Sequence, residues 1–134
     1  MALYPYLNFG GTCREAFTRY QEILGGELEV LTFAELPDGE QMPGVAPDMV
    51  MHAALRFGDD LLMASDDPGF DGVRGIAVNL TLTDPDEARR VFAALAEGGE
   101  VTMPLAETFW SPVFGMCTDR FGIPWMINVE PGDE

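Results

Sequence analysis

Hydrophobic residues recur along this chain with two different periods, and the period changes at glycines and prolines. Over two segments the spacing is that of one face of an α-helix, carried by Ala16, Phe17, Tyr20, Ile23 and Leu24 and then by Ala88, Val91, Phe92 and Leu95. The first helix is predicted to begin at Thr12, which opens a T-x-x-E capping box, and to end at Gly25. The second is predicted to begin at Asp84, with Pro85 in its first position, and to end at Gly98.

The other apolar segments are short, rich in β-branched and aromatic residues, and in several places alternate with polar residues, which is typical of strands. They predict eight strands, at residues 3–9, 27–36, 49–57, 61–65, 76–83, 100–103, 113–118 and 124–129. Residues 37–48 carry three prolines and two glycines and are predicted to form a loop. The acidic pairs Asp59-Asp60 and Asp66-Asp67 fall at predicted turns, where solvated carboxylates are expected.

The order of the predicted elements is the same in the two halves of the chain: a strand, a helix and three strands. The predicted helix caps are 72 residues apart, and the glycine pairs that end the helices, 25–26 and 98–99, are 73 apart. The Phe-Gly turns at 57–58 and 121–122 are 64 apart, and the loop at 37–48 accounts for the difference of 9. This repetition indicates a duplicated βαβββ module in one domain of 134 residues, with modules at 1–66 and 76–134 and a linker at 67–75.

Strand alternation assigns the side chains of the second module to two faces. One face, predicted to pack against the helix, carries Val78, Leu80, Leu82, Trp125, Ile127 and Val129. The opposite face then carries Asn79, Thr81, Met126 and Asn128. A few hydrogen-bonding groups in an apolar setting are typical of a small-molecule site. The alternative is that each asparagine bonds only neighbouring backbone or water.

Acidic residues greatly outnumber basic ones, since 23 Asp and Glu against 7 Lys and Arg give a formal net charge of −16. Such a charge repels phosphates and anionic lipids, so neither a nucleic-acid nor a membrane partner is expected, and a neutral or cationic small-molecule ligand is favoured. The N-terminal residues do not show a signal-peptide pattern, and no apolar run approaches the roughly 18 residues of a membrane span. Two widely separated cysteines, Cys13 and Cys117, fit reduced thiols in the cytoplasm.

Four further residues are candidates for binding or catalysis. His52 is the only histidine and is therefore the candidate general base; the alternative is a hydrogen-bonded structural role. Arg56, predicted to share a strand face with His52 and Val50, is suited to an anionic ligand or to an ion pair at the rim. Phe109 and Trp110 lie in an irregular stretch and are expected to line the pocket, face a partner subunit or pack in the core.

Three motifs occur in order over nearly the whole chain: Tyr6-Leu7-Asn8-Phe9-Gly10-Gly11, Met51-His52-Ala53 with Leu62-Met63-Ala64-Ser65-Asp66, and Asp119-Arg120-Phe121-Gly122-Ile123-Pro124-Trp125. In these motifs the chain resembles the vicinal oxygen chelate superfamily, which includes glyoxalase I, bleomycin-resistance proteins and extradiol dioxygenases. It more closely resembles the PhnB-like branch, often labelled 3-demethylubiquinone methyltransferase-like. The resemblance implies an α+β fold in which two tandem βαβββ modules form curled mixed sheets around a shared cavity, and it implies a homodimer.

In metal-using members of that superfamily, His, Gln or Glu ligands come from the first and last strands of each module. The corresponding positions here are Pro5, Met63, Ala77 and Met126, none of which suits a hard or borderline divalent metal. Met63 and Met126 are instead expected to contact the ligand as apolar groups. The chain also has no Gly-rich strand-to-helix loop of the kind that cradles a nucleotide-like cofactor, so no metal or other cofactor is expected.

Three functions are therefore open. The favoured one is a small-molecule-binding protein of the glyoxalase/bleomycin-resistance type that lacks the usual metal site. The second is a metal-independent enzyme that acts on a small metabolite through His52. The third, a metal-dependent lyase, isomerase or dioxygenase, is disfavoured by the residues at the ligand positions.

Overall fold

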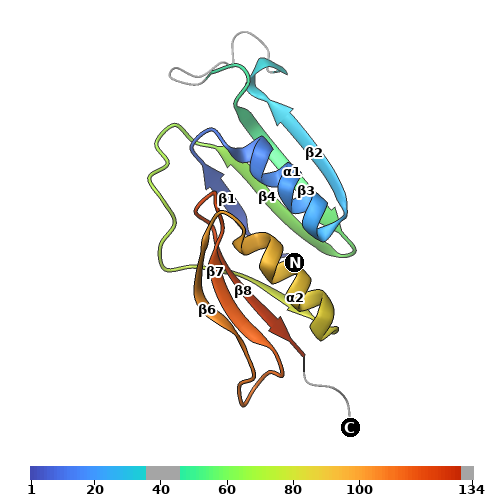
Figure 1. The fold of residues 1–134 in the computed structure, drawn as a ribbon. Helices are drawn as coiled ribbons and strands as arrows, with labels where there is room; N and C mark the ends of the chain where they lie inside the picture. Colours follow the sequence, from blue (N-terminus) through green and yellow to red (C-terminus); the bar gives the residue numbers. More distant parts are fainter. Residues whose placement is uncertain (36–45, 131–134) are drawn as a thin grey trace. The chain divides into compact units, whose positions relative to one another are not determined.

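The computed structural model describes residues 1–35 and 46–130, and its chain divides into two compact units, residues 1–72 and 73–134. Each unit is a four-stranded mixed sheet with one helix packed on one of its faces (Figure 1). The predicted α+β fold with two tandem βαβββ modules is confirmed. Most of the loop predicted at 37–48 lies outside the described residues. The shared cavity would need both units and stays a prediction.

The first unit contains β1 (Tyr6–Phe9), α1 (Cys13–Leu24), β2 (Glu27–Thr32), the short 3₁₀ helix η1 (Phe33–Glu35), β3 (Val50–Phe57) and β4 (Asp60–Asp66). Its strands lie in the order β1-β4-β3-β2. β1 and β4 are parallel, whereas the other neighbours are antiparallel. The strand predicted at 27–36 therefore ends early, because the chain turns into η1.

The second unit repeats this plan with β5 (Val78–Leu82), α2 (Pro85–Ala96), β6 (Glu100–Ala106), β7 (Phe114–Thr118) and β8 (Pro124–Val129). The strand order is β5-β8-β7-β6, again with the first and last strands parallel. β6 continues three residues beyond Glu100–Met103, the stretch with which this strand was predicted to begin. Two register shifts against β7 let it pass Pro104 and keep pairing as far as Ala106.

Each core lies between the helix and the inner face of its sheet. In the first unit the largest fully buried side chains are those of Phe9, Phe17, Tyr20, Val50 and Leu55, and in the second they are those of Val91, Ile123, Trp125, Ile127 and Val129. The alternation predicted for β5 and β8 is correct, since exposure alternates from residue to residue along both strands. Val50 was predicted to share the face of His52, and this is wrong. The register shift that puts His52 opposite Leu31 and Val50 opposite Thr32 turns Val50 toward the core.

The second glycine of each pair after a helix lies directly against the neighbouring strand. A Cβ atom on Gly26 would stand 2.5 Å from the carbonyl oxygen of Arg56, and one on Gly99 would stand 2.1 Å from that of Thr118. Real Cβ atoms do not approach so closely. The repeated Gly-Gly pair thus has the same role in both units, which is close approach of the chain leaving the helix to the end of a strand.

A buried carboxylate, not the predicted capping box, holds the start of α1. The side chain of Thr12 makes no capping hydrogen bond. Asp66, at the end of β4, instead accepts hydrogen bonds from the backbone N–H groups of Gly11 (2.9 Å), Cys13 (3.0 Å) and Val50 (2.8 Å). Asp66 is only 5% exposed, so the expectation of a solvated turn carboxylate is wrong for this residue. It joins β1, α1, β3 and β4 at one point.

A second buried carboxylate organises the turn before β8. Asp119 accepts hydrogen bonds from the backbone N–H groups of Phe121 and Ile123 and from the indole Nε1–H of Trp125 at 2.9 Å. The Asp119 turn therefore fixes the orientation of Trp125, the largest core side chain in the second unit.

At the start of α2, the side chain of Asp84 accepts a hydrogen bond from the N–H of Asp86, as the sequence predicts.

Candidate ligand-binding faces of the two sheets

The face of the second sheet that points away from α2 brings together the four side chains predicted to share it. Asn79 lies opposite Met126 and Thr81 opposite Asn128 across the parallel β5–β8 pair. On the other side of β8, β7 adds Phe114 opposite Asn128 and Met116 opposite Met126. We call this set of six residues the Asn128 face. Their juxtaposition follows from strand register, whereas their role in binding stays a prediction.

The carboxamide of Asn128 is the polar group of this face that is left unsatisfied. Its Oδ1 atom is buried and has no hydrogen-bond partner within the described residues. Asn79, in contrast, donates from Nδ2 to Oγ1 of Thr81 at 3.0 Å. A buried acceptor without a donor costs about 1–3 kcal/mol. A molecule that donates an N–H or O–H to Asn128 would recover this free energy.

Trp110 extends the Asn128 face with an aromatic wall. Its ring packs edge-to-face on Phe114 at 5.3 Å between centroids, and Phe109 packs on it in turn at 4.7 Å. The segment is fixed at Ser111, whose Oγ lies 2.8 Å from the backbone carbonyl oxygen of Val129, within hydrogen-bond distance. Phe109 is 97% exposed, so core packing is excluded for it. An aromatic pair fixed in place beside the Oδ1 acceptor of Asn128 suits a ligand with an apolar or ring-shaped body.

The corresponding face of the first sheet carries His52, which lies beside Tyr6. The hydroxyl of Tyr6 is 3.3 Å from Nδ1 of His52, and the two rings are 5.9 Å apart. Met63 lies between Tyr6 and Ala54 in the register of the sheet. This interaction engages Nδ1 and leaves Nε2 of His52 without a partner within the described residues. Sequence reasoning missed the pairing because Tyr6 and His52 are 46 positions apart.

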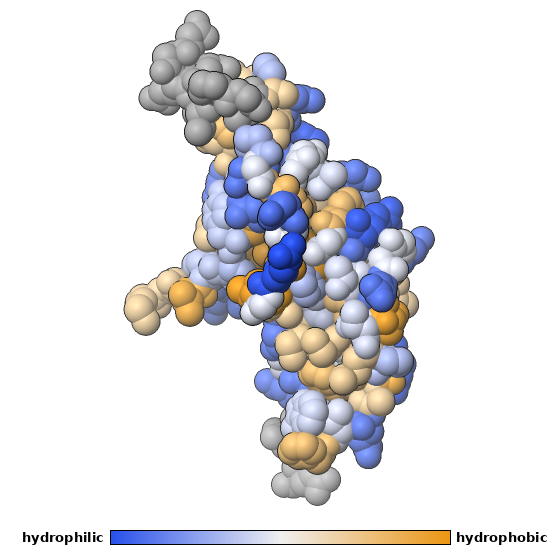
Figure 2. Space-filling view, turned by 90° about the vertical axis from the view of Figure 1, so that its left-hand side faces the viewer, coloured by the Kyte–Doolittle hydropathy of each residue, from blue (hydrophilic) through white to orange (hydrophobic). Residues whose placement is uncertain are grey.

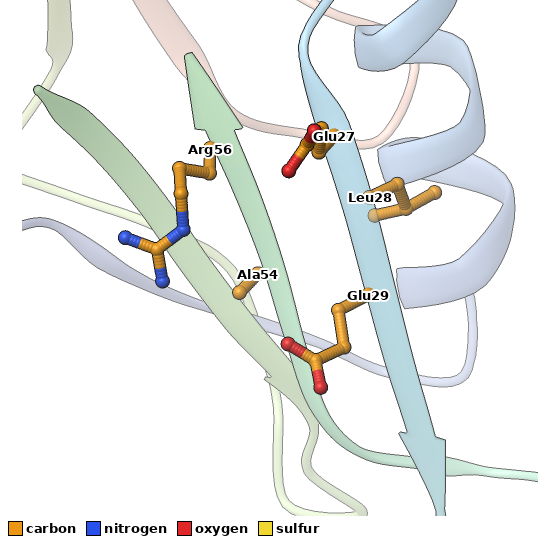
Figure 3. Close-up of a pocket in the computed structure, with 5 residues that line it drawn as sticks. All are labelled: Glu27, Leu28, Glu29, Ala54 and Arg56. Atoms are coloured by element: carbon orange, nitrogen blue, oxygen red, sulfur yellow. The ribbon is translucent and has the colours of Figure 1, made fainter. Parts of the chain in front are cut away.

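A hollow of about 150 Å³ lies on this same face over β2 and β3 (Figure 3). Its lining residues are Glu27, Leu28, Glu29, Ala54 and Arg56. The methyl group of Ala54 lies between longer neighbours, and Glu27 and Glu29 stand on the β2 side. Of these residues only Arg56 was predicted as a binding residue. The glutamates had no sequence signal beyond their alternation along a strand.

Side chains that could bind a metal ion do not cluster in the described part of the chain. Within residues 1–35 and 46–130, no three His, Cys, Asp or Glu side chains come together in a way that could hold a metal ion. Both cysteines are buried as free thiols. Burial, aided by the nearby charge of Asp66, raises the pKa of the Cys13 thiol to about 12, and burial with the charge of Asp119 raises the pKa of Cys117 to about 11. Neither thiol is therefore a ready nucleophile or ligand near neutral pH.

The surface of the described residues combines many charges with a few exposed apolar groups. Exposed apolar residues include Ile76, Val101, Met103, Phe109 and Trp110. On the side seen in Figure 2, apolar residues (orange) form separate patches between hydrophilic ones (blue). No helix in the described part of the chain is long and apolar enough to cross a membrane.

Comparison with known proteins identifies the class to which this fold and these faces belong. Residues 1–128 match the family model described as 3-demethylubiquinone-9 3-methyltransferase. The chain belongs to this family, which is the PhnB-like branch of the vicinal oxygen chelate superfamily that the sequence motifs indicate.

Individual relatives support this assignment along the full length of the chain. Protein YjdN of Escherichia coli (strain K12) is 38% identical over 143 residues, which cover 96% of this chain and 95% of that protein. The crystal structure of protein PA1353 from Pseudomonas aeruginosa is 48% identical with a TM-score of 0.89, covering 97% of this chain and 98% of that one.

A more distant structure shares the fold. The glyoxylase/bleomycin resistance protein/dioxygenase domain from Frankia sp. EAN1pec is 14% identical with a TM-score of 0.64, covering all of this chain and 94% of that one.

Proposed function

We propose that this protein binds a small neutral or cationic organic molecule on the Asn128 face, without a metal ion at the superfamily's usual position. The observation that carries the proposal is the buried, unpaired Oδ1 of Asn128 next to Phe114 and the Trp110 wall. A buried polar group without a partner in a native fold calls for an explanation, and a bound molecule that donates a hydrogen bond is the one proposed here. The ligand therefore carries an N–H or O–H donor and an apolar body.

The charge of the chain defines the ligand further. With a formal net charge of −16, the protein attracts cations and repels anions over distances up to about 10 Å at moderate salt. Met126 and Met116 add polarizable surface without charge. Ammonium or amide compounds with an aliphatic or aromatic group combine the required features.

The family description names a methyl transfer, which needs a methyl-donating cofactor. The two helix N-termini, which are the natural anion-binding points of such a fold, are already occupied by the chain's own carboxylates. Asp66 takes the N–H groups of Gly11 and Cys13, and Asp84 takes that of Asp86. These N–H groups are therefore already bound and do not fit a nucleotide-like cofactor. For this reason methyl transfer is not part of the proposal.

The test replaces the carboxamide with a side chain of similar shape, Asn128→Leu. Tryptophan fluorescence, to which Trp110 contributes beside this face, follows the titration of small primary amides and ammonium compounds, together with N-alkylated analogues that lack the donor. We expect at least one donor compound to bind the unmodified protein. Its affinity for Asn128→Leu should be at least about tenfold weaker, which corresponds to about 1.4 kcal/mol of binding free energy. Without ligand, Asn128→Leu should be as stable as the unmodified protein or more stable, because an unsatisfied acceptor is gone.

The control is Asn8→Leu, which replaces an exposed asparagine in the other unit. A loss of stability in Asn128→Leu with unchanged binding would show that the carboxamide is structural, and the proposal would fail. Metal analysis is the second arm, with less than one divalent ion expected per purified chain. One tightly held divalent ion per chain would overturn the metal-free part.

A metal-independent enzyme is the second candidate, and the Tyr6–His52 contact favours it. With Nδ1 engaged by the hydroxyl of Tyr6, Nε2 is left to accept or donate a proton. Each compound that binds is followed for turnover by mass spectrometry in the unmodified protein and in His52→Gln. Turnover lost in His52→Gln with unchanged affinity would support this candidate, and equal turnover in both proteins would remove His52 from it.

The homodimer implied by the resemblance belongs to the same proposal. Exposed apolar side chains on the edge strand β6, those of Val101 and Met103, support it, since each is 45% exposed. Sedimentation equilibrium should give twice the chain mass. A single chain mass at all concentrations would contradict the pairing.

A further inference from the structure

The hollow on the first sheet is bounded by charges of both signs, and its shape comes from one small residue. Ala54 is the central position, with Glu29 directly opposite on β2 and Arg56 two residues further along β3. Because successive side chains on one face of a strand are about 7 Å apart, the longer neighbours rise around the methyl group. The volume of about 150 Å³ is well below the roughly 300–1,000 Å³ of a drug-sized site. It suits a metabolite of a few heavy atoms.

The charges around the hollow do not neutralise one another. Glu27 lies directly opposite Arg56, where a cross-strand ion pair is the expected arrangement. Instead, the side chain of Arg56 extends away from β2 (Figure 3). No ion pair or hydrogen bond joins Arg56 to either glutamate within the described residues. Elsewhere in the described residues arginines do form such pairs, as Arg89 does with Asp86 at 2.8 Å.

Two poles result from this arrangement. The β2 side presents the carboxylates of Glu27 and Glu29, which repel each other and favour a cation near them. The β3 side presents a guanidinium whose fork matches a carboxylate. A ligand with only one charge would satisfy one pole and be repelled by the other.

From this juxtaposition we infer that the hollow over Ala54 is a binding site for a small zwitterion, a compound that carries an ammonium group and a carboxylate a few atoms apart. The ammonium group lies against Glu27 and Glu29, and the carboxylate is held by Arg56. This site is independent of the Asn128 face, because all of its residues belong to the first unit.

The test uses unbranched amino acids of increasing length as probes, from glycine through 4-aminobutyrate to 6-aminohexanoate. Butylamine and butyrate are the single-charge controls. Binding is followed by chemical-shift changes of the backbone amides in the labelled full chain. At least one zwitterion should shift amides of β2 and β3 around Glu29 and Ala54, and bind at least about tenfold more tightly than either control, or about 1.4 kcal/mol.

Two substitutions separate the poles. Arg56→Gln should lower the affinity for the zwitterion to that of butylamine, and Glu29→Gln should lower it at least threefold. The matched controls are Arg74→Gln and Glu100→Gln, which replace exposed charges outside the hollow and should leave the affinity unchanged. Circular dichroism of each variant checks that it is folded.

Three results would overturn the inference. The first is that butylamine or butyrate binds as tightly as every zwitterion tested. The second is that no probe shifts the amides of β2 and β3. The third is that Arg56→Gln and the unmodified protein bind the zwitterion with equal affinity. Shifts confined to the Asn128 face would support the proposed function and refute this site. Shifts in β2 and β3 alone would support this site, and the Asn128 face would then be judged by its own titration.

Discussion

The carboxylate of Asp66 provides the sharpest test of how the first unit is held together. It accepts three backbone hydrogen bonds while only 5% exposed, and these bonds start in three different segments of the unit. Asp66→Asn keeps one oxygen and turns an NH₂ group toward a backbone donor. It removes a bond to a charged acceptor and leaves a buried N–H unsatisfied. These two terms together predict a loss of about 2–4 kcal/mol in the free energy of unfolding.

Urea unfolding of Asp66→Asn measures this loss, and the positions of the aromatic residues make the assay informative. Both tryptophans, Trp110 and Trp125, lie in residues 73–134, whereas far-ultraviolet circular dichroism follows both helices. A lower midpoint by circular dichroism with an unchanged midpoint by tryptophan fluorescence would show that the units unfold separately. A lower midpoint by both would show that they unfold as one.

The control for this prediction is the next residue in the chain. Asp67 is exposed and accepts one local hydrogen bond, from the N–H of Gly69 at 2.8 Å. Asp67→Asn should change the stability by about 0.5 kcal/mol or less, as surface substitutions do. If Asp66→Asn and Asp67→Asn had the same small effect, the reasoning about the buried carboxylate would be refuted.

Three further predictions follow from individual contacts. Asp119→Asn removes the charge that accepts the indole N–H of Trp125 at 2.9 Å, and should cost about 1.5–3 kcal/mol in urea unfolding followed by tryptophan fluorescence; no loss would contradict this role. Gly25→Ala and Gly26→Ala both place a side chain at positive φ, which costs about 1–2 kcal/mol of stability. Only the Cβ atom at position 26 also meets a carbonyl oxygen, at 2.5 Å, so Gly26→Ala should lose more stability in urea unfolding, and equal losses would contradict this. The Cys13 thiol has its pKa raised from 9.0 to about 12, so its contribution to the free energy of unfolding is complete below pH 9 and is lost as the pH rises toward 12. In Cys13→Ala the stability should therefore fall less steeply between these pH values. An unchanged slope would argue against this contribution of the thiol.

The sequence predicts the elements of this fold well because their signals are local. Helical spacing, the Asp84 cap and the alternation along β5 and β8 each depend on residues within a few positions of one another, and all agree with the structure. The repeat of the Gly-Gly pair also has a physical basis, since Gly26 and Gly99 both approach a strand carbonyl.

The chain's local signals fail where a contact joins distant segments. Thr12 has the sequence of a cap, but Asp66, more than fifty positions later, holds the start of the helix instead. From a buried strand end it accepts the N–H groups of Gly11 and Cys13. The Tyr6–His52 contact and the hollow over Ala54 likewise depend on strand order. Asn128 was a candidate from alternation alone, but its unpaired oxygen could be recognised only once its neighbours were in place.

The order of the strands also has a consequence for how the protein is made. In each unit the last strand of the chain, β4 or β8, lies inside the sheet between the first strand and the third. Its insertion forms both the parallel and one antiparallel ladder, so neither sheet can close until that strand has been synthesised. During translation the first unit is therefore able to fold early, whereas the second waits for Val129 to leave the ribosome. Loss of β8 would open that sheet in the middle, not trim its edge.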